Sequence, residues 1–137
     1  MKRRISVILL LLAMLSGCSK KEEEKETLDL SLLNDTMAYS QLINIIKEPD
    51  EYLGTPIIVK GIYTAPFNGF SYQYNYTVTI QDNTQCCAQG IEFIMKEEGD
   101  LDKLPPEGEV VKISGVLELF EEGKHSYCII SDAAVTE

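Results

Sequence analysis

Features of the common enzyme classes are scarce in this sequence. It has one histidine, His125, and it contains no Gly-x-Ser-x-Gly, His-Glu-x-x-His or glycine-rich phosphate-binding motif. A single imidazole leaves little for general acid–base catalysis. Acidic pairs such as Glu97-Glu98 and Glu121-Glu122 fall in expected turns, which is typical of solvated surface. The sequence therefore favours a protein that is not an enzyme.

Basic residues are also few. The 137 residues include 12 Lys and Arg against 22 Asp and Glu, a formal net charge of −10. Residues 1–17 hold three of the basic and none of the acidic residues, so the rest of the chain has nine against 22 and a formal charge of −13. Because phosphate binding needs a patch of Lys or Arg side chains, we expect no nucleic acid partner. The same charge opposes adsorption to an anionic lipid surface.

The first apolar run, residues 5–14, is shorter than the roughly 20 residues that cross a bilayer. It follows three basic residues and precedes small ones, which is the pattern of a secretory signal. The stretch Leu15-Ser16-Gly17-Cys18 resembles the lipobox of bacterial lipoproteins. That resemblance implies cleavage of residues 1–17 and diacylation of Cys18, and two acyl chains suffice for stable attachment. The alternative is an ordinary signal peptide followed by a chance cysteine.

These features predict three segments. Residues 1–17 are expected to be a lipoprotein signal peptide, and residues 18–34 the lipidated cysteine and a charged tether. From Ser19 to Glu26 the tether has no apolar residue, so we expect it to be solvated. Residues 35–137 are expected to form one domain with a modest core. The protein would then be lipid-anchored at the cell membrane, on its extracytoplasmic face.

The domain is predicted to be mainly β, with a helix in front. Asp35 or Thr36 is expected to cap a helix that runs to about Glu48 and ends at Pro49. The apolar face of that helix is formed by Tyr39, Leu42, Ile43 and Ile46. Strands are expected at residues 57–63, 72–81, 91–95, 111–119 and 125–130, with Asn68-Gly69 as a two-residue hairpin turn.

Five strands with two hairpins suit a small closed barrel, and we predict a five-stranded OB-like barrel. Residues 52–61 and 107–115 resemble the first and fourth strands of bacterial OB-type domains. Gly61 and Gly115 lie in mid-strand, where a glycine permits the tight bend such barrels need. The helix of OB domains usually lies between strands three and four, but here it precedes strand one. A helix-first OB variant and a different small β-barrel fit equally well.

The cysteines are the first candidate site. Cys86, Cys87 and Cys128 remain after lipidation, an odd number that cannot pair completely within one chain. If strand three runs parallel beside strand five, these thiols and His125 could converge at one end of the barrel. Thiolates with an imidazole suit zinc or copper(I). The alternatives are a disulfide from Cys128 to Cys86 or Cys87, a Cys86–Cys87 disulfide, or buried free thiols.

A family resemblance bears on the same residues. Residues 82–93, with Cys86-Cys87-Ala88, resemble a segment in the soluble domain of an uncharacterised family of bacterial membrane proteins. Members of that family are associated with a predicted permease and, in some bacteria, with zinc-responsive control, which implies a possible zinc cofactor. Gln89-Gly90 stand where the family would have an acidic residue.

Aromatic residues form the second candidate site. Phe67 and Phe70 flank the expected turn, and Tyr72 and Tyr74 follow on a strand that OB domains use for binding. Exposed tyrosines could stack on sugars or peptides, whereas buried ones would belong to the barrel core. Two functions stay open. One is a non-enzymatic, lipid-anchored binding or accessory module with an envelope protein partner, and the other is a metal-binding or thiol-redox lipoprotein.

Overall fold

A computed structural model describes residues 25–69 and 73–137, so Cys18, Phe70 and Tyr72 lie outside the described residues. The structure is mainly β, with one α-helix. In chain order its elements are β1 (Leu28–Asp29), η1 (Leu30–Leu32), α2 (Asp35–Lys47), η2 (Pro49–Glu51), β2 (Pro56–Thr64), β3 (Phe67–Asn68), β4 (Gln73–Tyr74), β5 (Thr77–Gln81), β6 (Ala88–Met95), η3 (Glu98–Lys103), β7 (Val110–Glu122) and β8 (His125–Val135).

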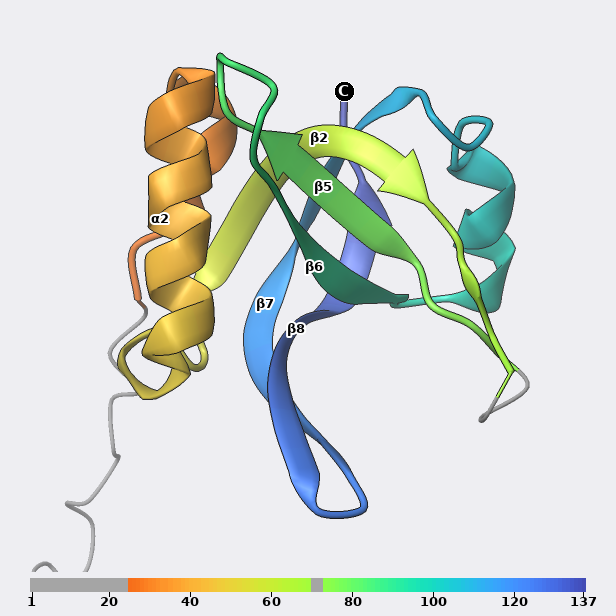
Figure 1. Ribbon diagram of the computed structural model, residues 1–137. Helices are drawn as coiled ribbons and strands as arrows, with labels where there is room; N and C mark the ends of the chain where they lie inside the picture. Colours follow the sequence, from red (N-terminus) through yellow and green to blue (C-terminus); the bar gives the residue numbers. More distant parts are fainter. Residues whose placement is uncertain (1–24, 70–72) are drawn as a thin grey trace, which may run out of the picture.

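The main sheet closes into a ring. Its strand order is β1-β2-β5-β6-β8-β7, and an additional pairing between β2 and β7 joins its two sides (Figure 1). Around the ring, β6 and β8 are parallel and the other neighbours are antiparallel. The third and fifth strands of the ring are therefore parallel neighbours, as the sequence predicts.

Helix α2 stands beside the ring and packs against β5, β6 and β8 (Figure 1). Asn34 caps it, since its side-chain oxygen accepts a hydrogen bond from the Met37 backbone N–H at 3.0 Å. The helix thus begins one residue earlier than the predicted caps allow, and it ends just before Pro49. The buried stripe is centred on Ala38, Leu42 and Ile45. It is rotated from the predicted face, of which only Leu42 is fully buried.

The core fills the ring and the space under α2. Val59, Val78, Ile113 and Leu117 are completely buried, as the strand pattern predicts. Two glycines allow the strands to approach closely. A Cβ at Gly61 would collide with the Thr79 carbonyl group, and one at Gly115 would collide with the Ile130 side chain and the Ser131 carbonyl oxygen. Both mid-strand glycines therefore lie where a neighbouring strand leaves no room for a side chain.

Two boundaries differ from the sequence prediction. The folded chain begins before residue 35, because Leu28 and Asp29 pair in parallel with β2 and Leu30 is 1% exposed. The predicted two-residue turn is also wrong. Asn68 pairs with Gln73, so Asn68 belongs to a strand and the connection that follows it is longer. The single strand expected at residues 72–81 is divided into β4 and β5.

Candidate functional site

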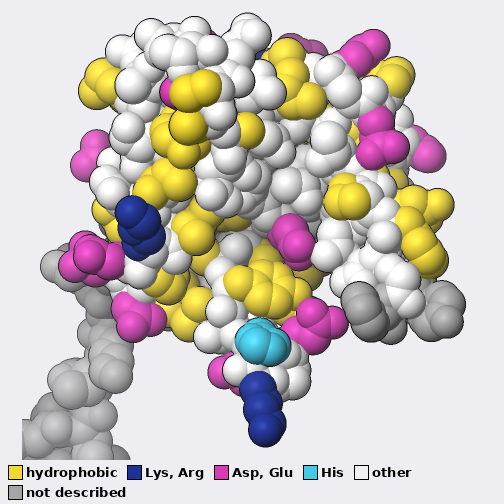
Figure 2. All heavy atoms as spheres, in the orientation of Figure 1, with side chains coloured by type: hydrophobic (Ala, Val, Ile, Leu, Met, Phe, Trp, Pro, Cys, Tyr) yellow, Lys and Arg dark blue, Asp and Glu magenta, His cyan; other side chains and the backbone are white. Residues whose placement is uncertain are grey.

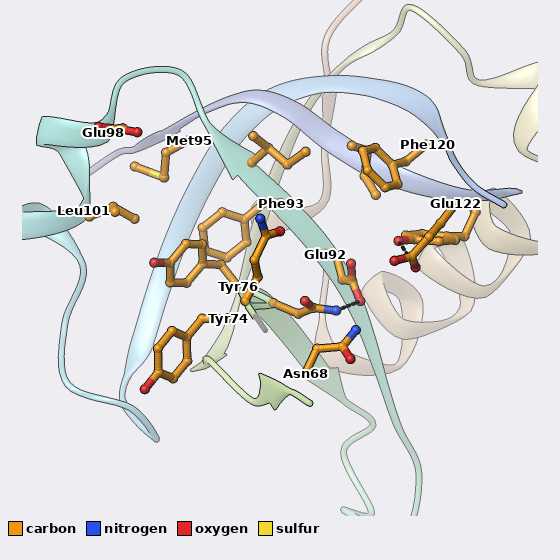
Figure 3. Close-up of a pocket in the computed structure, with 15 residues that line it drawn as sticks. Asn68, Tyr74, Tyr76, Glu92, Phe93, Met95, Glu98, Leu101, Phe120 and Glu122 are labelled. Atoms are coloured by element: carbon orange, nitrogen blue, oxygen red, sulfur yellow. Dashed lines mark hydrogen bonds between the residues drawn. The ribbon is translucent and has the colours of Figure 1, made fainter. Parts of the chain in front are cut away.

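A cavity of about 560 Å³ lies between the β3–β4 hairpin, strand β6 with η3, and the β7–β8 hairpin (Figure 3). In the ring, these hairpins are the connection between the first and second strands and the connection between the fourth and fifth. Each region contributes side chains to one concave surface. The residues that line it are Asn68, Gln73, Tyr74, Asn75, Tyr76, Glu92, Phe93, Ile94, Met95, Glu98, Leu101, Phe120, Glu122, Tyr127 and Ile129.

Aromatic rings form both the floor and the rim. On the floor, Tyr76 stacks on buried Phe93 with a centroid distance of 6.0 Å. On one side of the rim, Tyr74 is 60% exposed and meets Phe67 edge-on at 5.4 Å. On the other side, Phe120 and Tyr127 are 5.6 Å apart across the β7–β8 hairpin. The cavity therefore offers exposed ring faces on two opposing loops.

The charged side chains of the cavity are all carboxylates. A Glu92 oxygen accepts a hydrogen bond from the Asn75 side-chain amide at 3.0 Å. A Glu122 oxygen accepts one from the Tyr127 hydroxyl at 3.4 Å. Glu98 adds a third carboxylate, and no described residue that lines the cavity is a Lys, Arg or His. In Figure 2, acidic side chains border the apolar surface next to the β7–β8 hairpin.

Burial, together with this negative surface, shifts the pKa of Tyr127. Burial raises the pKa of its phenol above the ordinary value of 10.0, and the nearby charges of Glu92 and Glu122 raise it further. The phenol therefore stays a neutral donor at physiological pH. The carboxylates raise this pKa because a second negative charge beside them is unfavourable, and the same field would attract a cation.

The cavity joins part of the predicted aromatic surface to residues outside the predicted site. Phe67 and Tyr74 lie together on the rim and are exposed, but Tyr72 and Phe70 are not described. The sequence patterns did not indicate Glu92, Phe120 and Tyr127. A signal for two of them exists, since Phe120 lies three residues before the Gly123-Lys124 turn and Tyr127 three residues after it, and the two form a cross-strand pair.

A second cluster lies on the loop between β5 and β6. The ligand atoms of Asp82, Cys86 and Cys87 all lie within 4.8 Å of one another. The two sulfurs are 3.4 Å apart, and the Cys86 sulfur is 3.6 Å from Asp82 Oδ2. Thr84 donates a hydrogen bond to the same Asp82 oxygen at 2.8 Å, and this bond is the main cause that lowers the pKa of Asp82. The pKa of Cys87 is raised by its interactions with Cys86.

The other predicted members of that site lie elsewhere. Cys128 is 9% exposed in the core, where burial raises the pKa of its thiol to about 11. His125 is exposed at the tip of the β7–β8 hairpin, paired with Glu122. The tip and the β5–β6 loop lie at opposite ends of the ring (Figure 1). The predicted convergence is therefore wrong for Cys128 and His125, and the three cysteines of the described chain are free thiols.

Within the described residues, no helix has the length and apolar character needed to cross a membrane. No family model matches the chain, and no curated protein matches it. The resemblance to the permease-associated family is therefore not supported.

Among solved structures, the chain is similar to a protein from Klebsiella pneumoniae subsp. pneumoniae described as a "putative nucleic acid-binding lipoprotein". The two share 18% identity over 88% of this chain and 99% of that chain, with a TM-score of 0.44. That description contradicts the expectation, drawn from net charge, that nucleic acid is excluded as a partner. The exclusion is withdrawn.

Proposed function

We propose that this protein is a lipid-anchored binding module on the extracytoplasmic face of a bacterial cell membrane, and that its ligand site is the 560 Å³ cavity. The lipobox-like stretch that ends at Cys18 supports the anchor. The tether would end where β1 begins, at Leu28. The size of the cavity is in the range of sites that take a small ligand or a few residues of a peptide.

An OB-like barrel is the architecture that this proposal uses. Five strands form the closed ring, β2, β5, β6, β8 and β7, and the third is parallel to the fifth. OB domains bind ligands on the face of strands two and three, between the loop that joins strands one and two and the loop that joins strands four and five. The corresponding parts here are β5–β6, the β3–β4 hairpin and the β7–β8 hairpin. The cavity lies between the two hairpins, against β6.

The observation that carries the proposal is the pairing of exposed aromatic faces with carboxylates in one cavity. Tyr74 and Phe120 present ring surface to solvent, and Glu92 and Glu122 line the same cavity (Figure 3). Ring faces attract cations, and a carboxylate adds a charge-assisted hydrogen bond. The ligand is therefore a group with an ammonium or guanidinium head, such as a basic segment of an envelope protein.

Calorimetric titration of the purified chain with a short Lys- and Arg-containing peptide tests this proposal. A peptide with acetylated lysines and citrulline in place of arginine keeps the length but removes the charge. We expect the charged peptide to bind and the neutral one to bind at least about tenfold more weakly, since a charged hydrogen bond contributes about 1.5–3 kcal/mol. A neutral oligosaccharide and a single-stranded oligonucleotide complete the panel, and tighter binding of either would contradict the proposed ligand class.

Matched variants locate the binding site. Glu92→Gln and Tyr74→Ala should each weaken binding of the charged peptide. Glu109→Gln removes the same charge from an exposed position outside the cavity, so it should leave affinity nearly unchanged. If Glu109→Gln weakens binding as much as Glu92→Gln does, the attraction is one of net charge, and the cavity is not the site.

A further inference from the structure

We propose that Asp82, Cys86 and Cys87 form a zinc-binding site on the β5–β6 loop. The site is separate from the cavity, because none of its members lines the cavity. It also differs from the metal site that the sequence suggests, since it takes a carboxylate from the same loop in place of His125 and Cys128. Two thiolates and one carboxylate would hold the ion.

Two of the three distances between ligand atoms lie close to those around a tetrahedral ion. Zinc binds sulfur at about 2.3 Å and carboxylate oxygen at about 2.0–2.2 Å, so two sulfurs on one ion stand about 3.8 Å apart, and a sulfur and an oxygen about 3.6 Å. The sulfurs of Cys86 and Cys87 are 3.4 Å apart. The Cys86 sulfur and Asp82 Oδ2 are 3.6 Å apart. Small side-chain movements would complete the site.

The loop explains how two consecutive cysteines can face one ion. On a strand, successive side chains point to opposite faces. Here the preceding residue, Gln85, has φ of 58°, a left-handed conformation that takes the backbone out of the strand. Hydrogen bonds from the Asp82 N–H to the Cys87 carbonyl at 3.0 Å and from the Gln85 N–H to the Asp82 carbonyl at 2.9 Å close the loop. The closed loop places both thiols beside the Asp82 carboxylate.

Neighbouring groups position these ligands. The Thr84 hydroxyl lies 2.8 Å from Asp82 Oδ2 and 3.0 Å from the Cys86 sulfur, so it orients two of the three ligands. Tyr39, on α2, contacts the Cys87 thiol. Groups that hydrogen-bond to metal ligands commonly change metal affinity 10–100-fold when they are removed.

The donor set selects zinc over other common ions. Calcium and magnesium prefer oxygen ligands only, and copper(I) prefers sulfur ligands, whereas zinc accepts thiolate and carboxylate together. Both cysteines are exposed, so a fourth position remains open to water. Zinc would also displace the thiol protons, because the metal binds the thiolate form.

The test uses the full-length chain in detergent, kept reduced, with zinc chloride and with cobalt(II) chloride as a spectroscopic substitute. We expect one zinc per chain in competition with a chromophoric chelator, and a thiolate-to-cobalt charge-transfer band. Cys86→Ser and Cys87→Ser should each remove the band. Asp82→Asn should weaken zinc binding at least about tenfold, and Thr84→Val about tenfold.

Two cysteine variants are matched controls, because they remove a thiol outside the cluster. Cys18→Ala and Cys128→Ala should leave the charge-transfer band and the zinc affinity unchanged. Far-UV circular dichroism checks that each variant keeps its fold, above all Cys128→Ala, which changes a buried residue of β8. Loss of the band in Cys128→Ala with the fold intact would overturn the proposed ligand set.

Two other results would overturn the proposal. One is the absence of stoichiometric zinc binding in the reduced protein. The other is a Cys86–Cys87 disulfide, found by peptide mass in protein isolated from cells without reductant, because it would show that the pair is held oxidised and cannot bind metal. Neither result bears on peptide binding in the cavity, so the two proposals are tested separately.

Discussion

Gly61→Ala should destabilise the ring more than any exposed glycine substitution. An ideal Cβ at residue 61 lies 2.8 Å from the Thr79 carbonyl carbon and closer still to its oxygen, although real Cβ contacts below 3.0 Å essentially do not occur. The obstacle is backbone, and β5 is held on its other side by five residue pairs with β6. The methyl group can therefore be accommodated only if β2 and β5 separate.

The magnitude follows from the cost of overpacking, about 1–3 kcal/mol. That is a large part of the roughly 5–15 kcal/mol that a domain has in total. In a domain of about 100 residues each kcal/mol lowers the melting temperature by about 4–8 °C, so a 2 kcal/mol loss lowers it by roughly 10 °C. Urea titration, followed by circular dichroism, measures the free energy of unfolding directly.

Gly99→Ala is the matched control. A Cβ there meets no atom within 4 Å, and Gly99 does not have a positive φ. Its substitution should change the free energy of unfolding by less than about 0.5 kcal/mol. If Gly61→Ala and Gly99→Ala have the same urea midpoint, the close approach of β2 and β5 at this position is refuted.

Three further predictions concern the core, the anchor and the buried thiol. Val59→Asp puts an unpaired charge at a completely buried position, so it should cost several kcal/mol, and an unchanged melting curve would argue against this strand register. Cys18→Ala should abolish fatty-acid labelling and release the protein from membranes; labelled, membrane-bound variant protein would refute lipidation at this residue. At pH 8, iodoacetamide should modify Cys86 and Cys87 well before Cys128, because burial raises the pKa of Cys128 to about 11 and keeps it protonated until the pH approaches that value. Equal rates at all three thiols in folded protein would contradict that burial.

The strand pattern determines most of the ring, and particular residues explain why. Alternating apolar residues mark β2 and β7, because one face of each strand is buried and the period of a strand is two. Gly61 and Gly115 mark the places where neighbouring strands leave no room for a side chain. The helix can be predicted because Pro49 ends it, but it begins one residue earlier than expected and its buried face is rotated.

The cavity could be predicted only in part, because it is made by elements far apart in the chain. Tyr74 is predicted as a binding residue because it is aromatic. Its position opposite Phe120 depends on the relative orientation of the β3–β4 and β7–β8 hairpins, which no local pattern gives. The turn predicted at Asn68-Gly69 is wrong because local composition favours a tight turn, whereas the pairing of Asn68 with Gln73 requires a longer connection. The arrangement of the two cysteines on the β5–β6 loop could not be predicted for a similar reason. Gln85 leaves the strand, and nothing in the residue types announces a left-handed backbone there.

The early start of the folded chain restricts where the protein can work. The Lys25 amino group donates a hydrogen bond to the Leu53 carbonyl oxygen at 2.6 Å, and three residues later β1 joins the ring. If Cys18 carries the lipid, seven residues separate the bilayer surface from that attachment, and even fully extended they reach at most about 25 Å. A domain on so short a tether would stay within a thin layer next to the membrane. With that anchor, the proposed ligand would have to be presented within that layer, by a membrane protein or by another molecule that comes close to the lipid surface.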